Sequence, residues 1–202
     1  MTRVKFCGLR TEADVDAANR LRPDFAGFVL SAGYKRSVCE ESARQLRARL
    51  DPAIRAVGVF VDEPLQRVAG MLESGLIDCA QLHGSESDAY IEELKRVSER
   101  PVIKFLALQS KEDAARASVC PADFVLLDSG QGTGQTFDWH LAQEVERPFF
   151  LAGGLAADNV GQAIRTCRPY AVDVSSGIET GGVKDFKKMA AFMAEVQKED
   201  AI

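Results

Sequence analysis

The sequence of 202 residues contains no apolar run of 18 residues, the length that a membrane-spanning helix requires. Its start lacks the apolar stretch and the small-residue cleavage site of a secretory leader. The five cysteines are scattered and include no C-x-x-C pair, so neither a disulfide framework nor a zinc site is expected. These absences predict a protein of the reducing cytoplasm, with no membrane partner.

Basic residues form no cluster or stripe along the chain, and the net charge is −5. A nucleic acid is therefore not expected as a partner. No linker, low-complexity tract or clear repeat divides the sequence, and 46% of its residues are hydrophobic. We expect a single domain over residues 1–202 with one sizeable core, either as a monomer or as a homodimer.

Two kinds of segment alternate along the chain. Eight short apolar runs indicate strands covered on both faces, at residues 3–7, 25–30, 53–61, 77–82, 102–106, 124–127, 149–152 and 170–174. Each is followed by a stretch with helical spacing, at residues 12–21, 40–50, 65–73, 87–98, 111–117, 139–145, 158–166 and 185–196. Helix caps are expected at Thr11, Ser85 and Asp158.

This alternation predicts an α/β protein with parallel strands and right-handed crossovers, either a closed barrel or an open doubly wound sheet. The open sheet usually carries G-x-G-x-x-G after its first strand, whereas this turn is C-G-L-R. The glycine-rich turns come late in the chain, where a barrel places its phosphate site. We therefore predict a (β/α)8 TIM barrel.

Two late turns are candidates for binding phosphate. L-A-G-G-L contains Gly153 and Gly154, and D-V-S-S-G-I-E contains Ser175, Ser176 and Gly177. Glycines let backbone N–H groups approach an oxyanion closely. Either turn alone is equally well explained as a tight connection between strand and helix, but together they occupy the positions that barrels use for phosphate.

A thiol and a carboxyl stand out among the groups at the strand ends. Cys7 and Asp128 end the first and sixth strands, so a substrate lying across the barrel mouth could exchange protons with both. Taken alone, Cys7 is also explained as a small buried hydrophobe and Asp128 as a turn residue. The pair suits moving a proton from carbon to a neighbouring position without a metal or an organic cofactor.

Other groups near the mouth could contact a substrate. Arg36, in G-Y-K-R-S, is placed to bind a carboxylate with two parallel hydrogen bonds, and Lys35 is its rival. His83 could instead hydrogen-bond within its own loop. Asp173 interrupts an apolar run and therefore requires a fixed hydrogen-bond partner.

A third glycine-rich turn follows the sixth strand. Gly130, Gly132 and Gly134 suggest a loop that covers a ligand.

Several of these stretches together resemble the phosphoribosylanthranilate isomerase family. They are K-F-C-G-L-R, V-G-V-F-V-D, Q-L-H-G, L-L-D-S with G-T-G and F-D-W, L-A-G-G-L, and D-V-S-S-G-I-E with G-G-V-K-D. The resemblance implies a (β/α)8 barrel of tryptophan biosynthesis that needs no metal or cofactor. It implies an Amadori rearrangement that converts N-(5-phosphoribosyl)anthranilate into its 1-deoxyribulose 5-phosphate isomer.

The resemblance also implies roles for individual residues. Asp128 would protonate the ribose ring oxygen, Cys7 would take the C2′ proton, and Arg36 would hold the anthranilate carboxylate. Gly154, Ser176 and their neighbours would bind phosphate through backbone N–H groups. Two alternatives stay open: the related histidine-pathway sugar isomerase, which uses an aspartate in place of Cys7, and a non-catalytic phosphate-binding barrel.

Overall fold

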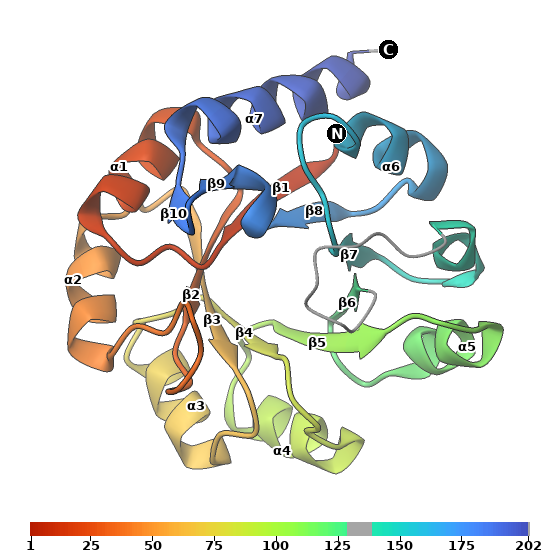
Figure 1. Ribbon diagram of the computed structural model, residues 1–202. Coiled ribbons are helices and arrows are strands. Elements are labelled where there is room, and N and C mark those ends of the chain that lie inside the picture. Colours follow the sequence, from red (N-terminus) through yellow and green to blue (C-terminus); the bar gives the residue numbers. More distant parts are fainter. Residues whose placement is uncertain (129–138, 202) are drawn as a thin grey trace.

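A closed barrel of eight parallel strands forms the centre of the molecule (Figure 1). The structure, a computed structural model, describes residues 1–128 and 139–201. The strands pair in chain order, and the last pairs back with the first. They are β1 (Arg3–Cys7), β2 (Phe25–Val29), β3 (Arg55–Phe60), β4 (Cys79–Leu82), β5 (Val102–Ala107), β6 (Phe124–Asp128), β7 (Phe149–Leu151) and β8 (Ala171–Val174).

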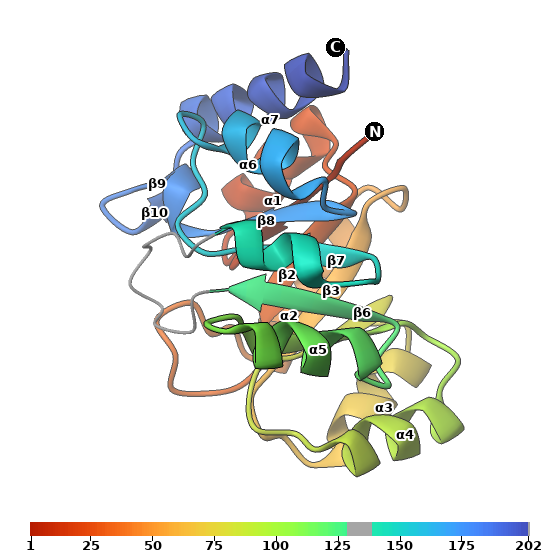
Figure 2. The ribbon, with the colours of Figure 1, turned by 90° about the vertical axis from the view of Figure 1, so that its right-hand side faces the viewer.

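Helices surround the barrel on its outer side (Figures 1 and 2). They are α1 (Glu12–Leu21), α2 (Glu40–Arg49), α3 (Leu65–Glu73), α4 (Asp88–Val97), α5 (Lys111–Val119), η1 (Trp139–Glu144), α6 (Val160–Cys167) and α7 (Phe186–Asp200). After β8 the chain adds a 3-10 turn, η2 (Ser176–Ile178), and a small hairpin of β9 (Glu179–Thr180) and β10 (Val183–Lys184). The barrel predicted from the sequence is confirmed, and the open sheet was the wrong alternative.

Local structure departs from the prediction at two helix starts and in one helix. Thr11 caps α1 in a reciprocal capping box as expected, but Ser87 rather than Ser85 caps α4. The hydroxyl of Ser85 instead donates to Asp62, in the loop after β3. The residue at the N-cap of α6 is Asn159 rather than Asp158. The helical stretch predicted at residues 139–145 is the 3-10 helix η1. Pro148 follows it closely and disfavours helical backbone at Arg147, the residue before the proline.

Two apolar clusters hold the barrel together. The larger lies between the sheet and the surrounding helices, and the smaller groups buried residues from β2 to β8. In the smaller cluster the ring of Phe150 packs edge-on against Phe25 and Phe124, with centroids 5.2 and 5.7 Å apart. These side chains fill the barrel near the amino ends of its strands, away from the mouth.

Polar residues replace the apolar ones farther along the same faces of the strands. Side chains alternate along a strand, so residues two apart share a face. Asp128 therefore follows Leu126 on the inner face of β6, and Asp173 follows Ala171 on the inner face of β8. The barrel thus has an apolar amino end and a polar carboxyl end, which faces the viewer in Figure 1.

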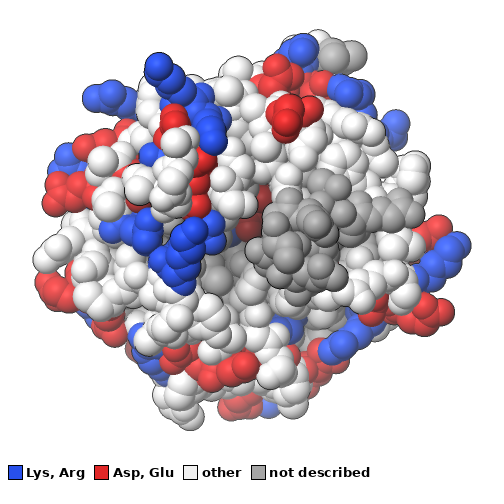
Figure 3. Space-filling view, in the orientation of Figure 1, with Lys and Arg blue, Asp and Glu red and all other residues white. Residues whose placement is uncertain are grey.

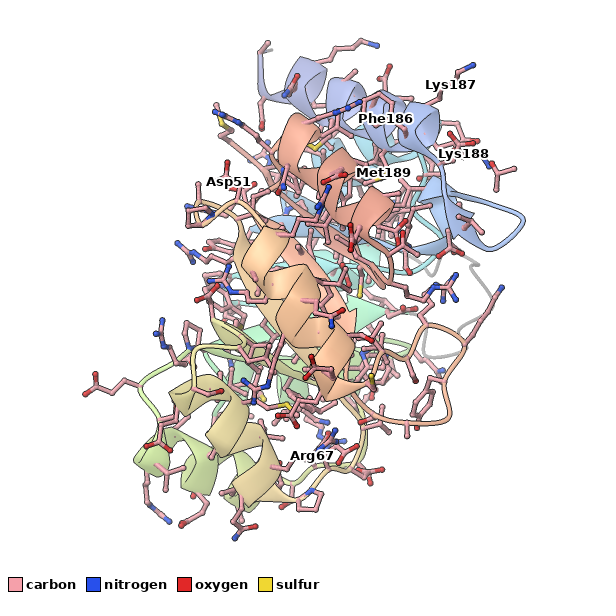
Figure 4. The ribbon with its side chains drawn as sticks, turned by 90° about the vertical axis from the view of Figure 1, so that its left-hand side faces the viewer. Asp51, Arg67, Phe186, Lys187, Lys188 and Met189 are labelled. Carbon is pink, nitrogen blue, oxygen red and sulfur yellow. The ribbon has the colours of Figure 1, made fainter. Side chains whose placement is uncertain are left out.

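The outer surface of the last helix is polar. Lys187 and Lys188 point outward from α7, whereas Met189 is buried (Figure 4). Cys39 is exposed at the start of α2, with its sulfur 3.2 Å from Ser42 Oγ. Within residues 1–128 and 139–201, no helix combines the length and the apolar character needed to cross a membrane.

Removing the Phe150 ring is expected to destabilise the barrel strongly. Phe150→Ala should lower the free energy of unfolding by about 3–5 kcal/mol, because rigid strands cannot collapse into the cavity. Urea unfolding would measure the loss. Val119→Ala is the matched control, since Val119 is 80% exposed, and should change stability by less than about 0.5 kcal/mol. A loss below about 1 kcal/mol for Phe150→Ala would contradict this description of the core.

Candidate active site

A cavity of about 380 Å³ opens at the carboxyl ends of the strands. Figure 3 shows Lys and Arg side chains gathered to the left of the hollow at the centre of this face. The lining brings together strand ends and loops that are distant in sequence. Sequence-predicted residues in the lining are Cys7, Lys35, Arg36, His83, Asp128, Gly153, Gly154, Asp173, Ser175 and Ser176.

Cys7 and Asp128 end strands β1 and β6, and both are half-buried. The backbone N–H groups of the next two residues after Cys7 donate to the Gly27 carbonyl, which fixes the turn that follows the thiol. Both side chains line the same cavity, as the proposed proton-transfer pair requires. Neither position needs an unusual backbone conformation to present its side chain, because each simply ends a strand.

Asp173 has the fixed partner that its buried position requires. Its Oδ1 accepts a hydrogen bond of 2.8 Å from Lys5 Nζ on the neighbouring strand, where the two residues are paired in register. Burial acts to lower the pKa of Lys5, but its interactions with Asp173 and Cys7 together outweigh this effect and the pKa is raised. Lys5 and Asp173 thus form a salt bridge inside the barrel mouth.

Arg36 is held in place by a carboxylate from the other end of the chain. Its Nε and one terminal nitrogen donate to the two oxygens of Glu179, at 2.7 and 2.8 Å. Lys184 Nζ donates to the same carboxylate at 2.8 Å. Burial acts to raise the pKa of Glu179, but these cations hold it at about 2. The other terminal nitrogen of Arg36 makes no contact with Glu179, so it can serve an anion in the cavity.

The loops after β7 and β8 supply the candidate phosphate site. Gly153 and Gly154 both have positive φ, at 86° and 62°, so a side chain there would strain the turn. Gly177 admits no side chain at all, because an added Cβ would collide with the Leu155 carbonyl oxygen of the neighbouring loop. Glycine therefore brings the two loops into close contact at the edge of the cavity.

His83 is oriented by its neighbours. Its ring stacks on Phe105 with centroids 4.2 Å apart, and its Nδ1 lies 3.0 Å from Gln81 Nε2. Burial, with a smaller contribution from Lys5, lowers the pKa of His83, so the imidazole is neutral at neutral pH. His83 is thus hydrogen-bonded to Gln81 of β4, the strand that precedes its loop, and it also lines the cavity.

A second buried ion pair supports this side of the mouth. Lys104 Nζ donates to Glu86 Oε2 at 2.7 Å and to the Gly84 carbonyl at 2.6 Å. The same carboxylate group accepts backbone N–H bonds from Asp62 and Gly84. Glu86 therefore ties the loops after β3 and β4 to strand β5.

Comparison with known proteins identifies the family to which the chain belongs. A family model described as N-(5'phosphoribosyl)anthranilate (PRA) isomerase matches residues 4–195. The chain belongs to this family. An N-(5'-phosphoribosyl)anthranilate isomerase from Endomicrobium trichonymphae is 43% identical over 194 residues, covering 94% of this chain and 95% of that protein.

Solved structures of the isomerase family agree with this assignment. The phosphoribosyl anthranilate isomerase from Thermus thermophilus superposes with a TM-score of 0.89 at 35% identity, covering 98% of this chain and 99% of the other. Another family member was solved in complex with reduced 1-(o-carboxyphenylamino)-1-deoxyribulose 5-phosphate. Its TM-score is 0.86 at 32% identity, covering 98% of this chain and 100% of that one. The resemblance noted in the sequence is confirmed.

Some predicted residues fall outside this description, and three important ones were missed. Gly130, Gly132 and Gly134 lie outside the described residues. The sequence interpretation gave no role to Lys5, Glu179 or Lys184. Each lies within a stretch that carries the isomerase resemblance, K-F-C-G, S-S-G-I-E and G-G-V-K-D, and that resemblance was the available signal.

Glu179 should stabilise the isomerase in a pH-dependent way. Its pKa of about 2 in the folded protein lies below the ordinary value near 4.3, so its contribution is complete above about pH 5 and is lost on acidification. Glu179→Gln should lower the free energy of unfolding by about 1–3 kcal/mol at pH 7, and this difference from wild type should shrink toward pH 3. Urea unfolding between pH 3 and 7 would test it.

The control for this experiment is an acidic residue whose ion pair lies in solvent. Glu144 is 3.5 Å from Lys111, and both side chains are more than half exposed. Glu144→Gln should change stability at pH 7 very little, because solvent screens such pairs. A difference between Glu179→Gln and wild type that stays constant across the pH range would contradict the assignment of the low pKa to Glu179.

Proposed function

We propose that this chain catalyses the Amadori rearrangement of N-(5'-phosphoribosyl)anthranilate to 1-(2-carboxyphenylamino)-1-deoxyribulose 5-phosphate, a step of tryptophan biosynthesis. The observation that carries the proposal is one cavity lined by a thiol, carboxyl groups, cations and the glycine-containing loop after β7. The substrate offers a matching set of groups: a carbon-bound proton, a ring oxygen, a carboxylate and a phosphate. The family assignment supports the same reaction.

The first step opens the ribose ring. Asp128, as the acid, donates its proton to the ring oxygen while the C1′–O bond breaks and its electron pair goes to that oxygen. The nitrogen lone pair forms the C1′=N bond of a protonated Schiff base.

The second step moves the proton from C2′. Cys7, as the thiolate base, takes that proton, and the C–H electron pair forms a C1′=C2′ bond while the C1′=N pair returns to nitrogen. In the resulting enolamine the C2′ hydroxyl loses its proton as the C2′=O bond forms, and the C1′=C2′ electron pair takes up a proton at C1′, which gives the ketone. Substrate and product are isomers, so no external oxidant or reductant is consumed.

The proposal assigns the phosphate and the carboxylate of the substrate to different binding groups. We infer that the phosphate binds the backbone N–H groups around Gly153, Gly154, Ser175, Ser176 and Gly177. Arg36, oriented by Glu179, is placed to hold the anthranilate carboxylate. His83 and Asp173 stay candidates for substrate contact, and the monomeric or homodimeric state and the cytoplasmic location stay predictions.

Removing either proton-transfer group should abolish most turnover. Cys7→Ala and Asp128→Asn are each expected to lower kcat by about 10²–10⁴-fold while leaving the fold intact. The substrate would be generated in place from anthranilate and phosphoribosyl pyrophosphate by a helper transferase, and loss of its fluorescence followed. Cys39→Ser, at an exposed cysteine, is the matched control and should retain wild-type turnover.

Each outcome of this assay bears on the proposal. A near-wild-type kcat in either variant would reject that residue's role. Absence of turnover in the wild type would reject the substrate, and the histidine-pathway phosphoribosyl sugar would be tested next.

The carboxylate site can be tested by comparing two neighbouring cations. Arg36→Ala should raise KM by about 10- to 100-fold, because it removes a charge-assisted hydrogen bond to the substrate. Lys35→Ala is the matched comparison: Lys35 also lines the cavity but is exposed, and should have the smaller effect. Steady-state kinetics of both variants decides the matter, and a larger KM increase for Lys35→Ala would place the carboxylate there.

A further inference from the structure

Lys5 is a buried cation that the proton-transfer scheme above leaves without a role. Its side chain is fully buried on the inner face of β1. A lysine in such a position is costly unless its charge is compensated, and replacing a buried ion pair by apolar residues often leaves stability unchanged. The ion pair with Asp173 therefore explains how Lys5 is tolerated, but folding alone gives no reason to have it there.

The position of Lys5 relative to Cys7 supplies a reason. The two residues are two apart on β1, so both side chains lie on its inner face. Gly27 on β2 is paired with Cys7, and a Cβ added there would lie 3.0 Å from Cys7 Sγ and 3.3 Å from Lys5 Cε. Both side chains therefore pass over the same glycine, which places the end of the Lys5 side chain beside the sulfur.

Four charged groups act on the Cys7 sulfur. Lys5 lies beside it on β1, and Asp173 lies on β8. Lys184 reaches it from β10, and Arg36 from the loop after β2. Burial is the largest influence and leaves the pKa of Cys7 raised above its ordinary value, and Lys5 is the strongest influence in the opposite direction.

The other two cations, Arg36 and Lys184, are already paired with an anion. Arg36 and Lys184 both donate to the Glu179 carboxylate, which offsets part of their effect on the sulfur. Lys5 is only two residues from Cys7 in the sequence. Within residues 1–128 and 139–201, its one ion pair is with Asp173.

We propose that Lys5 is a positioning residue that stabilises the thiolate form of Cys7 when the base is needed, with Asp173 fixing the place of the Lys5 ammonium. The inference rests on the proposed role of Cys7 as the base. When the C2′ proton passes from carbon to sulfur, the negative charge leaves the sulfur and Lys5 keeps its own protons. Lys5 is therefore neither acid nor base: it makes the thiolate available in a site where burial opposes it.

Two substitutions should shift the Cys7 pKa in opposite directions. Lys5→Met removes the cation with an unbranched side chain of similar length, and should raise the pKa of Cys7 by about 1–3 pH units. Asp173→Asn removes the anion that opposes thiolate formation, and should lower it. The double variant Lys5→Met/Asp173→Asn leaves neither member of the ion pair as an unpaired buried charge. Its Cys7 pKa should be higher than that of the wild type.

The measurement is the pH dependence of alkylation of Cys7 by iodoacetamide, with the modified site identified by mass spectrometry. All variants carry Cys39→Ser, because Cys39 is the exposed cysteine, whereas Cys79, Cys120 and Cys167 are buried. Circular dichroism and urea unfolding would establish that each variant is folded. The acidic limb of the profile of kcat/KM against pH should move with the alkylation midpoint.

Opposite shifts of the midpoint would support the inference. An unmoved midpoint in a folded Lys5→Met variant, or shifts of the same sign for both charges, would overturn it and leave Lys5 with a structural role. If Lys5→Met does not fold, the double variant and Asp173→Asn provide the test. A raised midpoint in the double variant and a lowered one in Asp173→Asn would support the inference, and unmoved midpoints would overturn it. Alkylation does not depend on turnover, so the expected shifts in a chain lacking isomerase activity would reject the proposed function and not the link between Lys5 and Cys7.

Discussion

Closure of eight parallel strands is the constraint on which the site depends. Every second side chain of each strand points into a space that the backbone encloses on all sides, and this space opens only at its ends. At the amino end it is filled by rings such as Phe25 and Phe150. At the carboxyl end the same faces carry Cys7, Asp128 and Asp173 around a cavity. A single periodicity thus produces both the core and the site.

Placing charged groups at the mouth of a barrel requires that they be paired. Lys5 is matched by Asp173, and Glu179 is shared by Arg36 and Lys184. The Lys5–Asp173 and Arg36–Glu179 pairs join residues that are distant in sequence, so each fixes the place of a strand end or loop as well as compensating a charge. Groups held in this way keep their orientation before a substrate arrives, which is the condition for electrostatic catalysis in a water-poor site.

Much of the fold could be predicted because the signals are local. Buried strands in a parallel barrel are short apolar runs. The predicted ends of these runs differ from the observed strand ends by two residues or fewer. Errors arose where two local signals competed. Ser85 and Ser87 are both suitable N-cap residues for α4. The hydroxyl of Ser85 instead donates to Asp62, which lies 23 positions away in the sequence, and Ser87 caps the helix.

Site residues divide in the same way. Cys7 and Asp128 could be proposed from their places at strand ends, and the glycine turns from their composition. Lys5 could not, because a lysine between apolar residues of a strand is compatible with an exposed edge, and its partner Asp173 lies 168 residues away. Nor could the sequence show that Glu179 orients Arg36 across a separation of 143 residues.

The sequence by itself determined the alternation of strands and helices, the barrel class, the family and the chemical identity of the groups at the strand ends. Those properties follow from residue type and spacing along a short stretch of chain. The tertiary structure alone decided which charges meet, which cation faces Cys7 and how Arg36 is held. These depend on distance in space, and electrostatic energy depends on that distance and on the exclusion of water, neither of which the order of residues specifies.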